Sequence, residues 1–186
     1  MTLQVLSKPC IHLAMGFYDG MSLIMVLLGV LVLFTAVFAA KAPEGREKLS
    51  YSSILLIGAG GLGAFLSTDL FFFYAFHELA LIPTFLMIGM LGTGERKEAA
   101  WKITIYLALG SIILLAGLIW LVSASGSDTW LFKDLLASNI DPKAQSGIAA
   151  LLIVGFGVLI SLFPFHSWAA PAYAAAPAPV AMLHAG

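Results

Sequence analysis

Long apolar runs divide this chain, and they constrain its fold more than any other feature. In order, they are Met21–Ala40, Leu49–Thr68, Leu70–Gly92, Ile103–Ser123 and Ala144–Gly186. About 20 apolar residues in a helix cross the hydrocarbon core of a bilayer. The chain is 61% hydrophobic and 10% charged, whereas a soluble domain carries about 25% charged residues. The sequence therefore predicts an all-α, polytopic bundle of transmembrane helices.

The last run needs a break. Ala144–Gly186 contains no Asp, Glu, Lys or Arg and is too long for one membrane helix. It also contains prolines that cannot all sit inside regular helix: Pro164, Pro171, Pro177 and Pro179. We expect a span from Ser146 to about Phe163, an interrupted stretch, and a new helix near Pro179. The bundle then has about five spans plus a broken helix.

Basic residues predict the orientation of the bundle. Of the 9 Lys and Arg residues, most lie in the two short loops Lys41–Lys48 and Glu95–Lys102. Cytoplasmic loops carry this excess, so both loops are predicted to face the cytoplasm. Residues 1–20 are predicted to be an extramembrane segment and residues 21–186 a transmembrane domain. The net charge of −1 gives no indication of nucleic-acid binding.

The glycines of Gly58–Gly63 match the dinucleotide-binding pattern G-x-G-x-x-G. That pattern has its meaning in a soluble strand–turn–helix unit, whereas here it lies inside an apolar run. Small residues in a membrane helix more often permit the close approach of another helix. We therefore interpret these glycines as helix-packing positions.

Glu78 is an ionisable residue inside the apolar run Leu70–Gly92. A charge at such a place costs about 2.5–3.5 kcal/mol on insertion scales, and usually serves ion or proton movement. Pro83 cannot donate to the Leu79 carbonyl and is expected to kink the helix beside the acid. Glu78 is therefore the main candidate for proton handling. The alternative is a permanently protonated side chain that bonds a neighbouring helix.

Three histidines accompany this acid. His77 points about 100° away from Glu78 on a helix, and is either a second titrating group or a bridge to another helix. His166 follows Pro164, where the last span breaks, and broken membrane helices tend to line polar cavities. His184 lies too near the chain end to be judged. The spacing of the three does not predict a metal site. Asp69 is expected to cap the helix that carries Glu78.

At these residues the chain resembles a known family. Phe72–Gly92 resembles the acid-bearing helix of the proton-pumping membrane subunits of complex I. The Glu-Leu-x-Leu-Ile-Pro pattern of Glu78–Pro83 is most similar to the chain 4 (subunit M) type of bacterial NADH-quinone oxidoreductase. Further similar segments are Asp19–Leu23, Tyr106 with Gly110 and Ser111, Pro164–Trp168, and Ala176 with Pro177. The resemblance covers about residues 17–186.

The resemblance implies an antiporter-like fold built from inverted five-helix repeats, of which this chain carries the first. It implies a proton-translocating subunit of an enzyme, embedded in the bacterial inner (plasma) membrane beside other membrane subunits of a complex I-like assembly. In that family the acid on the fifth helix pairs with a lysine on the seventh. NADH, flavin, iron-sulfur clusters and quinone are implied in partner subunits, and no cofactor or redox chemistry in this chain.

Two departures from the family pattern qualify these expectations. The seventh-helix lysine would fall at Leu159, and Trp168–Tyr173 lacks the family's acid and histidine. A cation for Glu78 could come from His166, from chain beyond Gly186 or from another subunit. The second repeat is also missing, so an N-terminal fragment of a longer protein is expected.

Two other functions stay open from the sequence. The chain could belong to a multisubunit cation/proton antiporter or a membrane-bound hydrogenase, which share the fold. It could also be a non-pumping structural membrane subunit, a reading that the missing lysine at Leu159 favours.

Overall fold

The computed structural model describes residues 2–7, 10–16 and 19–186. Five helical segments in this part of the chain are long and apolar enough to cross a membrane. This is the polytopic all-α bundle that the sequence predicts. Its helices are α1 (Gly20–Ala39), α2 (Glu47–Leu66), α3 (Leu70–Leu79), α4 (Leu81–Leu91), α5 (Arg96–Ser125), α6 (Phe132–Ala137), α7 (Pro142–Leu159), η1 (Phe165–Trp168), α8 (Ala169–Ala175) and α9 (Ala178–Ala185).

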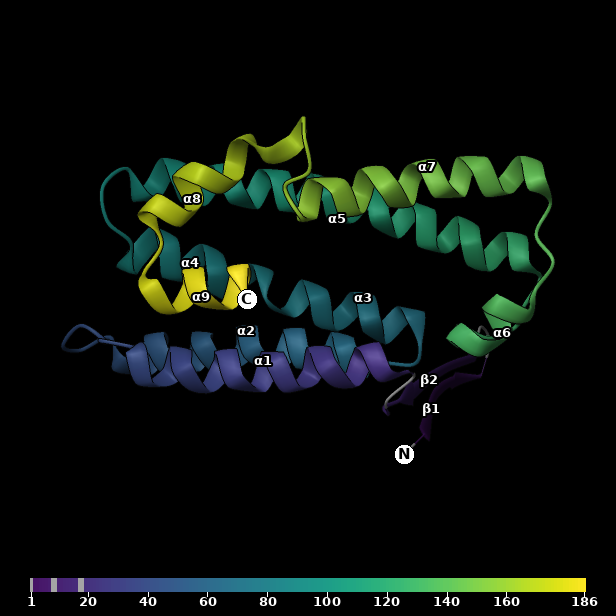
Figure 1. The fold of residues 1–186 in the computed structure, drawn as a ribbon, viewed down its shortest axis with the longest axis horizontal. Helices are drawn as coiled ribbons and strands as arrows, with labels where there is room; N and C mark the ends of the chain where they lie inside the picture. The colour runs from purple at the N-terminus through teal and green to yellow at the C-terminus, as the bar shows by residue number, and fades with distance from the viewer. Residues whose placement is uncertain (1, 8–9, 17–18) are drawn as a thin grey trace.

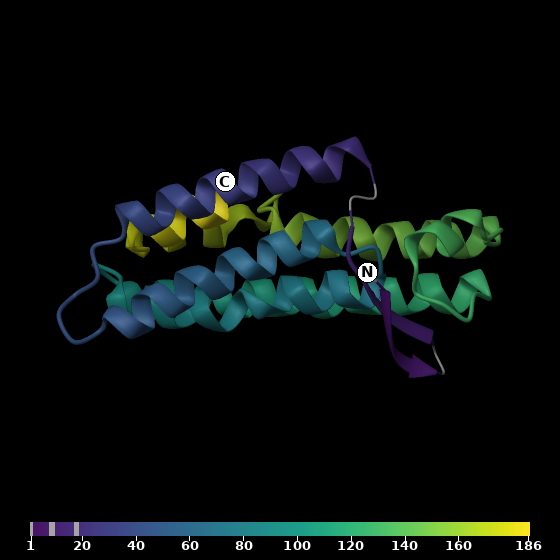
Figure 2. The same cartoon turned by 90° about the horizontal axis from the view of Figure 1, so that it is seen from below.

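The long helices run along one axis of the molecule (Figures 1 and 2). In Figure 1, α1 and α2 lie below, α3 and α4 follow one another in the middle, and α5 and α7 lie above. The most extensive contact between elements joins α5 to α7, and α2 packs on both α1 and α3. Most charged residues lie in the loops and first turns at the two ends of this bundle, as expected for a membrane protein.

The glycines of α2 allow its neighbours to come close. A Cβ atom at Gly58 would lie 2.5 Å from the Leu33 side chain of α1, and one at Gly63 would lie 2.4 Å from the Phe76 ring of α3. Such distances are shorter than real carbon contacts, so an added methyl group would have to displace the Leu33 or Phe76 side chain. The helix-packing interpretation is confirmed at Gly58, Gly60 and Gly63, whereas an added Cβ at Gly61 would meet nothing within 4 Å. All of these glycines lie within a helix rather than at a phosphate-binding turn.

Two helix boundaries differ from the prediction. α5 begins at Arg96, so the expected charged loop is largely helical. Ala99 and Ala100 are buried there, which lets the charged first turn pack on the bundle through its small side chains. α7 ends at Leu159 rather than near Phe163, and Ser161 takes a left-handed conformation with φ of 55°. A left-handed residue stops a right-handed helix.

After this break the chain turns back through η1, α8 and α9. α9 begins at Ala178 with a proline in its first turn, so the helix expected near Pro179 is confirmed. A proline is tolerated there because the first amide groups of a helix have no partner within it.

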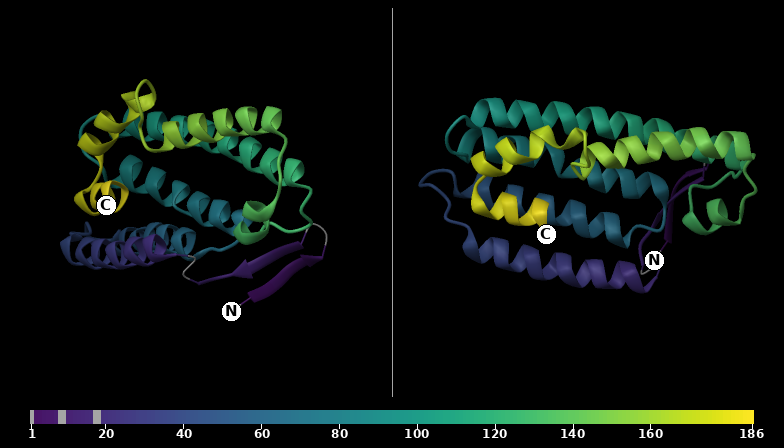
Figure 3. Two further views of the ribbon diagram at one scale, coloured as in Figure 1. Left: turned by 45° about the vertical axis from the view of Figure 1, so that its right-hand side comes forward. Right: turned by 45° about the horizontal axis from the view of Figure 1, so that its top comes forward.

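The N-terminal segment forms a feature that the sequence did not predict. Strands β1 (Thr2–Ser7) and β2 (Cys10–Ala14) pair as an antiparallel hairpin. The Gly16 amide donates to the Leu66 carbonyl at 2.9 Å, which ties the hairpin to the end of α2. Figure 3 places it at the end of the bundle opposite the α1–α2 and α4–α5 loops.

The two charged loops lie at one end, as the basic residues predict. Arg46 before α2 and Arg96 at the start of α5 both donate to the Met90 carbonyl, at 3.1 and 3.2 Å. Two cationic side chains near the C-terminus of α4 also interact favourably with the dipole of that helix.

Candidate functional site

The span that carries Glu78 is broken. α3 ends at Leu79, α4 begins at Leu81, and Ala80 forms the turn between them. Pro83 has no amide hydrogen for the Leu79 carbonyl, while the Thr84 hydroxyl and amide both donate to the Ala80 carbonyl, at 2.7 and 3.2 Å. The predicted kink is confirmed as a break between two helices, and Glu78 lies in the last turn before it.

Asp69 holds the other end of α3. Its Oδ1 accepts the amide hydrogens of Phe71 and Phe72 at 2.9 and 3.3 Å. The Asp69 side chain is fully buried, at 0% exposure, where a carboxylate needs such donors. The predicted N-terminal cap is confirmed, and it fixes where α3 starts and therefore which face carries Glu78.

Glu78 contacts a buried hydroxyl on the neighbouring long helix. Ser111 of α5 is 2% exposed, and its Oγ donates a hydrogen bond to Glu78 Oε1. The same Ser111 Oγ hydrogen-bonds the Tyr74 hydroxyl at 3.0 Å. Tyr74 and Glu78 are four residues apart and lie on one face of α3. Three polar groups thus meet between α3 and α5.

Sequence reasoning missed this triad of Tyr74, Glu78 and Ser111. The four-residue spacing of Tyr74 and Glu78 is a signal that could have joined those two. Ser111 is 33 residues from Glu78 in the chain. Its contact with the acid depends on how α5 packs against α3, which no local pattern reveals.

His77 lies beside the acid and faces another part of the bundle. Its Nδ1 is 3.8 Å from Glu78 Oε1, and the two side chains are 31% and 35% exposed. In the part of the chain that the structure describes, His77 Nδ1 is buried without a hydrogen-bond partner. A buried polar atom left in this way costs about 1–3 kcal/mol, so it marks His77 for a role beyond packing.

His77 lines a cavity of about 400 Å³ at the middle of the bundle. Leu159, the last residue of α7, and His184 of α9 line the same cavity. Figure 1 shows why: the α3–α4 break, the end of α7 and the C-terminal end of α9 all lie midway along the long axis. The position where the resemblance places a lysine thus lines the same cavity as both histidines.

His184 is held by the turn that follows the break. Its Nε2 lies 2.7 Å from the Thr84 hydroxyl, across 100 residues of chain. The His184 side chain is partly buried. The sequence offered no way to place it, because the partner is brought in by the return of the chain through α8 and α9.

His166 lies elsewhere. Its ring is exposed and stacks on Phe163, with ring centroids 5.5 Å apart. The neighbouring Ser167 hydrogen-bonds the Tyr106 hydroxyl at 2.8 Å. The structure does not bring His166 into the cavity with His77, and a role for it stays a prediction. Among the described residues, no group of three or more His, Cys, Asp and Glu side chains could hold a metal ion.

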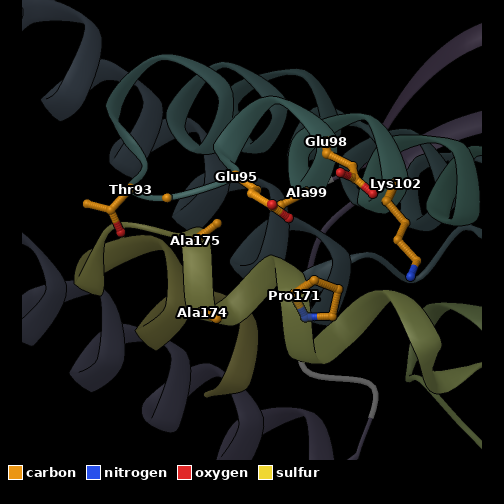
Figure 4. Close-up of a pocket in the computed structure, with 9 residues that line it drawn as sticks. Thr93, Glu95, Glu98, Ala99, Lys102, Pro171, Ala174 and Ala175 are labelled. Carbon is orange, nitrogen blue, oxygen red and sulfur yellow. The ribbon is translucent and has the colours of Figure 1, made fainter.

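A second cavity, of about 300 Å³, opens at the end of the charged loops. Figure 4 shows it between the start of α5 and α8, lined by Glu95, Glu98, Lys102 and Pro171. Its charged lining suits an aqueous surface, in contrast to the largely apolar lining of the cavity at His77.

Together these features define a polytopic helical membrane protein with an acid at a broken span. The chain matches the family described as NADH:quinone oxidoreductase/Mrp antiporter, TM, over residues 67–186. It therefore belongs to that family.

The sequence relatives support this membership. The chain is 35% identical to NAD(P)H-quinone oxidoreductase chain 4 2 of Microcystis aeruginosa, over 90% of this chain and 31% of that protein. It is 36% identical to the chain 4 2 of Thermosynechococcus vestitus, over 90% of this chain and 32% of that one. The chain thus spans about a third of the length of the curated relatives that it matches.

Solved structures share the fold. A chain of respiratory complex I from Thermus thermophilus superimposes with a TM-score of 0.85 at 28% identity, over 98% of this chain and 39% of that chain. A chain of the archaeal membrane-bound sulfane sulfur reductase superimposes with a TM-score of 0.72 at 30% identity, over 84% of this chain and 34% of that chain. A chain of the Mrp complex from a Dietzia species superimposes with a TM-score of 0.69 at 26% identity, over 97% of this chain and 35% of that chain.

Proposed function

We propose that this chain belongs to a proton-translocating membrane subunit of an NADH-quinone oxidoreductase, which couples quinone reduction to proton transport. The observation that carries the proposal is Glu78 at the break of its span, bonded to Ser111 and 3.8 Å from His77. The similarity to chain 4 proteins supports the assignment to this enzyme. An intramembrane acid with polar neighbours is what a proton relay requires.

The setting of this proposal follows from the same similarity. Residues 21–186 form the transmembrane domain in a bacterial inner membrane, and residues 1–20 lie outside it. Other membrane subunits of a complex I-like assembly are the partners. NADH, flavin, iron-sulfur clusters and quinone act in those partner subunits, and this chain moves protons.

Two neighbours of Glu78, Ser111 and His77, affect its protonation in different ways. The Ser111 hydroxyl donates to the carboxylate and stabilises it. The Tyr74 hydroxyl bonds the same Ser111 oxygen, which holds that serine beside the acid. On the other side, His77 can accept a proton from Glu78 or give one back. Glu78 therefore lies between the hydroxyl donor of Ser111 and the imidazole of His77.

The first test is Glu78→Gln in the assembled, membrane-embedded complex. A positioned acid or base contributes about 100-fold or more to a proton-transfer step, so proton pumping and coupled quinone reduction should fall to near background. Pumping is measured in sealed vesicles with a pH-sensitive dye, and assembly by native gel electrophoresis. The matched control is Glu47→Gln, which removes an exposed acid from the first turn of α2. Normal pumping by Glu78→Gln would contradict the proposal.

A cation/proton antiporter is the second candidate. The fold match to the Mrp complex at 26% identity favours it. The two functions differ in their ion dependence: an antiporter exchanges Na⁺ or K⁺ for protons without any quinone substrate. Proton uptake that is driven by a Na⁺ or K⁺ gradient in vesicles without NADH would support the antiporter.

The hypothesis of a non-pumping structural subunit rests on Leu159. This leucine occupies the cavity position where the resemblance places a lysine. If the chain is a pump with its cationic group elsewhere in the cavity, Leu159→Lys should not increase pumping. If the wild-type protein does not pump and Leu159→Lys does, the wild-type chain is the non-pumping structural subunit. The measurement is the same vesicle assay, with Leu159→Met as the size-matched control.

A further inference from the structure

We propose that His77 and His184 share one proton across the cavity between them, and so provide the cationic counterpart of Glu78. The inference rests on the proposed function, since it assigns a partner to the same acid. It needs three things: a base on each side, room for water between them, and a reason for a single proton. The described residues supply each of these.

Thr84 determines which nitrogen of His184 is the base. A threonine hydroxyl has one hydrogen, and the Thr84 hydroxyl donates it to the Ala80 carbonyl, which can only accept. The Thr84 oxygen must then accept from His184 Nε2, 2.7 Å away. Neutral His184 therefore carries its hydrogen on Nε2, and Nδ1 is the nitrogen that can take a proton. Thr84 is a positioning residue for His184.

His77 supplies the base on the other side. Its Nδ1 is buried without a hydrogen-bond partner among the described residues and lies 3.8 Å from Glu78 Oε1. A protonated His77 would form an ion pair with the ionised acid at this distance, within a medium where such a pair is strong. His77 is thus the site where the shared proton stabilises ionised Glu78.

The cavity has room for water between the rings. Its volume of about 400 Å³ compares with about 30 Å³ for one water in the liquid. The lining from α2, α5 and α7 is apolar, and Tyr173 of α8 is the further ionisable group among the described lining residues. Glu78 and Tyr74 of α3 approach from the side of the triad. Waters in this cavity would therefore bond mainly to the two histidines and Tyr173.

One proton, rather than two, follows from repulsion. Both rings line the same cavity, and two like charges in a largely apolar cavity disfavour each other. In the transfer step an N–H bond of protonated His77 breaks, the proton passes along water, and a bond to His184 Nδ1 forms. His77 becomes neutral, His184 becomes cationic, and the total charge is unchanged. Glu78 then loses its counter-ion and can take up the next proton.

The first arm of the test measures pumping by the assembled complex in vesicles. His77→Gln and His184→Gln should each lower pumping at least about tenfold, because each removes a proton-binding base. The double variant should pump as well as the less active of the two single variants, since the effects of substituting residues that act as one unit are not additive. Tyr51→Phe changes an exposed tyrosine of α2 that does not line the cavity, and this control should pump normally. Multiplied losses in the double variant would overturn the shared proton.

The second arm does not depend on pumping. Nitrogen NMR of ¹⁵N-histidine in the full protein, reconstituted in bilayers, reports the tautomer and charge of each ring. Neutral His184 should show its hydrogen on Nε2. Thr84→Val should give a mixture of the two His184 tautomers, and Thr84→Ser should restore the tautomer with its hydrogen on Nε2. The pH at which His184 gains its proton should change in His77→Gln. Independent titration of the two rings would overturn the inference.

The two arms separate the failure of this inference from the failure of the proposed function. If Glu78→Gln pumps normally while the two histidines titrate as a pair, the proposed function fails and the shared proton stands. If Glu78→Gln abolishes pumping while both histidine variants pump normally, the function stands and the shared proton is wrong.

Discussion

At the scale of single residues, polar side chains inside the bundle hydrogen-bond to one or two other groups. Asp69 accepts two amides at the start of α3, and Glu78 has Ser111 on α5. His184 has the Thr84 hydroxyl. Among the described residues, His77 Nδ1 and Trp130 Nε1 are buried without a hydrogen-bond partner. Burying such a group is costly, and His77 Nδ1 also lies 3.8 Å from Glu78 Oε1, which points to a role of His77 in function.

Ser111→Ala tests the triad at this scale. The variant removes the hydroxyl that bonds Glu78, and a hydrogen bond to a charged group is worth about 1.5–3 kcal/mol. Proton pumping in vesicles should therefore fall about tenfold or more, with assembly unchanged. Thr104→Val is the control on the same helix, since among the described residues the Thr104 hydroxyl bonds the Ala100 carbonyl of its own helix. Equal activity of both variants would rule out a role for Ser111.

At the scale of elements, the bundle depends on helices that approach closely. The seam between α5 and α7 shows this: a Cβ atom at Gly155 would lie 2.8 Å from the backbone of Leu114. Backbone atoms cannot move aside as a flexible side chain can. Close packing in this seam places α7 beside α5, and so brings Leu159 at the end of α7 into the lining of the cavity.

Two glycines of α7 form a matched pair for testing this seam. Gly155→Ala forces the helices apart and should lower the free energy of unfolding by about 1–3 kcal/mol, the usual cost of overpacking. Gly157→Ala should be neutral or slightly stabilising, because its Cβ would meet Leu162 at an ordinary 3.6 Å and alanine favours helix. Thermal unfolding in detergent compares them. A stable Gly155→Ala protein would show that the seam is looser than the structure indicates.

At the scale of the whole molecule, the two charged loops and the hairpin lie at opposite ends. The basic loops at one end predict that this end faces the cytoplasm. Both the second cavity of Figure 4 and the loops belong to this end. A proton that reaches Glu78 must cross from one end to the middle of the bundle, where the cavity lies.

Single cysteines test the orientation. With Cys10 replaced by serine, Glu44→Cys in the α1–α2 loop should react with a membrane-impermeant thiol reagent only in inside-out vesicles. Asn139→Cys, between α6 and α7, should react only in right-side-out vesicles or intact spheroplasts. Both positions are exposed. Labelling of both cysteines from one side would contradict the topology.

The sequence by itself determined the number of spans, the break near Pro83, the Asp69 cap and the position of the acid. These depend on local chemistry: apolar length, the missing amide of proline, and short-range capping. The N-terminal hairpin was missed, and the ends of α5 and α7 were misplaced. Those features depend on packing and on a left-handed turn that has no strong local signal.

Only the tertiary structure decided what surrounds Glu78. Ser111 reaches Glu78 because α5 packs on α3, and His184 reaches Thr84 because the chain returns through α9 to the α3–α4 break. The physical reason is that apolar patterning shows which residues enter the membrane, whereas polar contacts across the bundle depend on how the helices pack. The sequence therefore located the acid, and the fold located its partners.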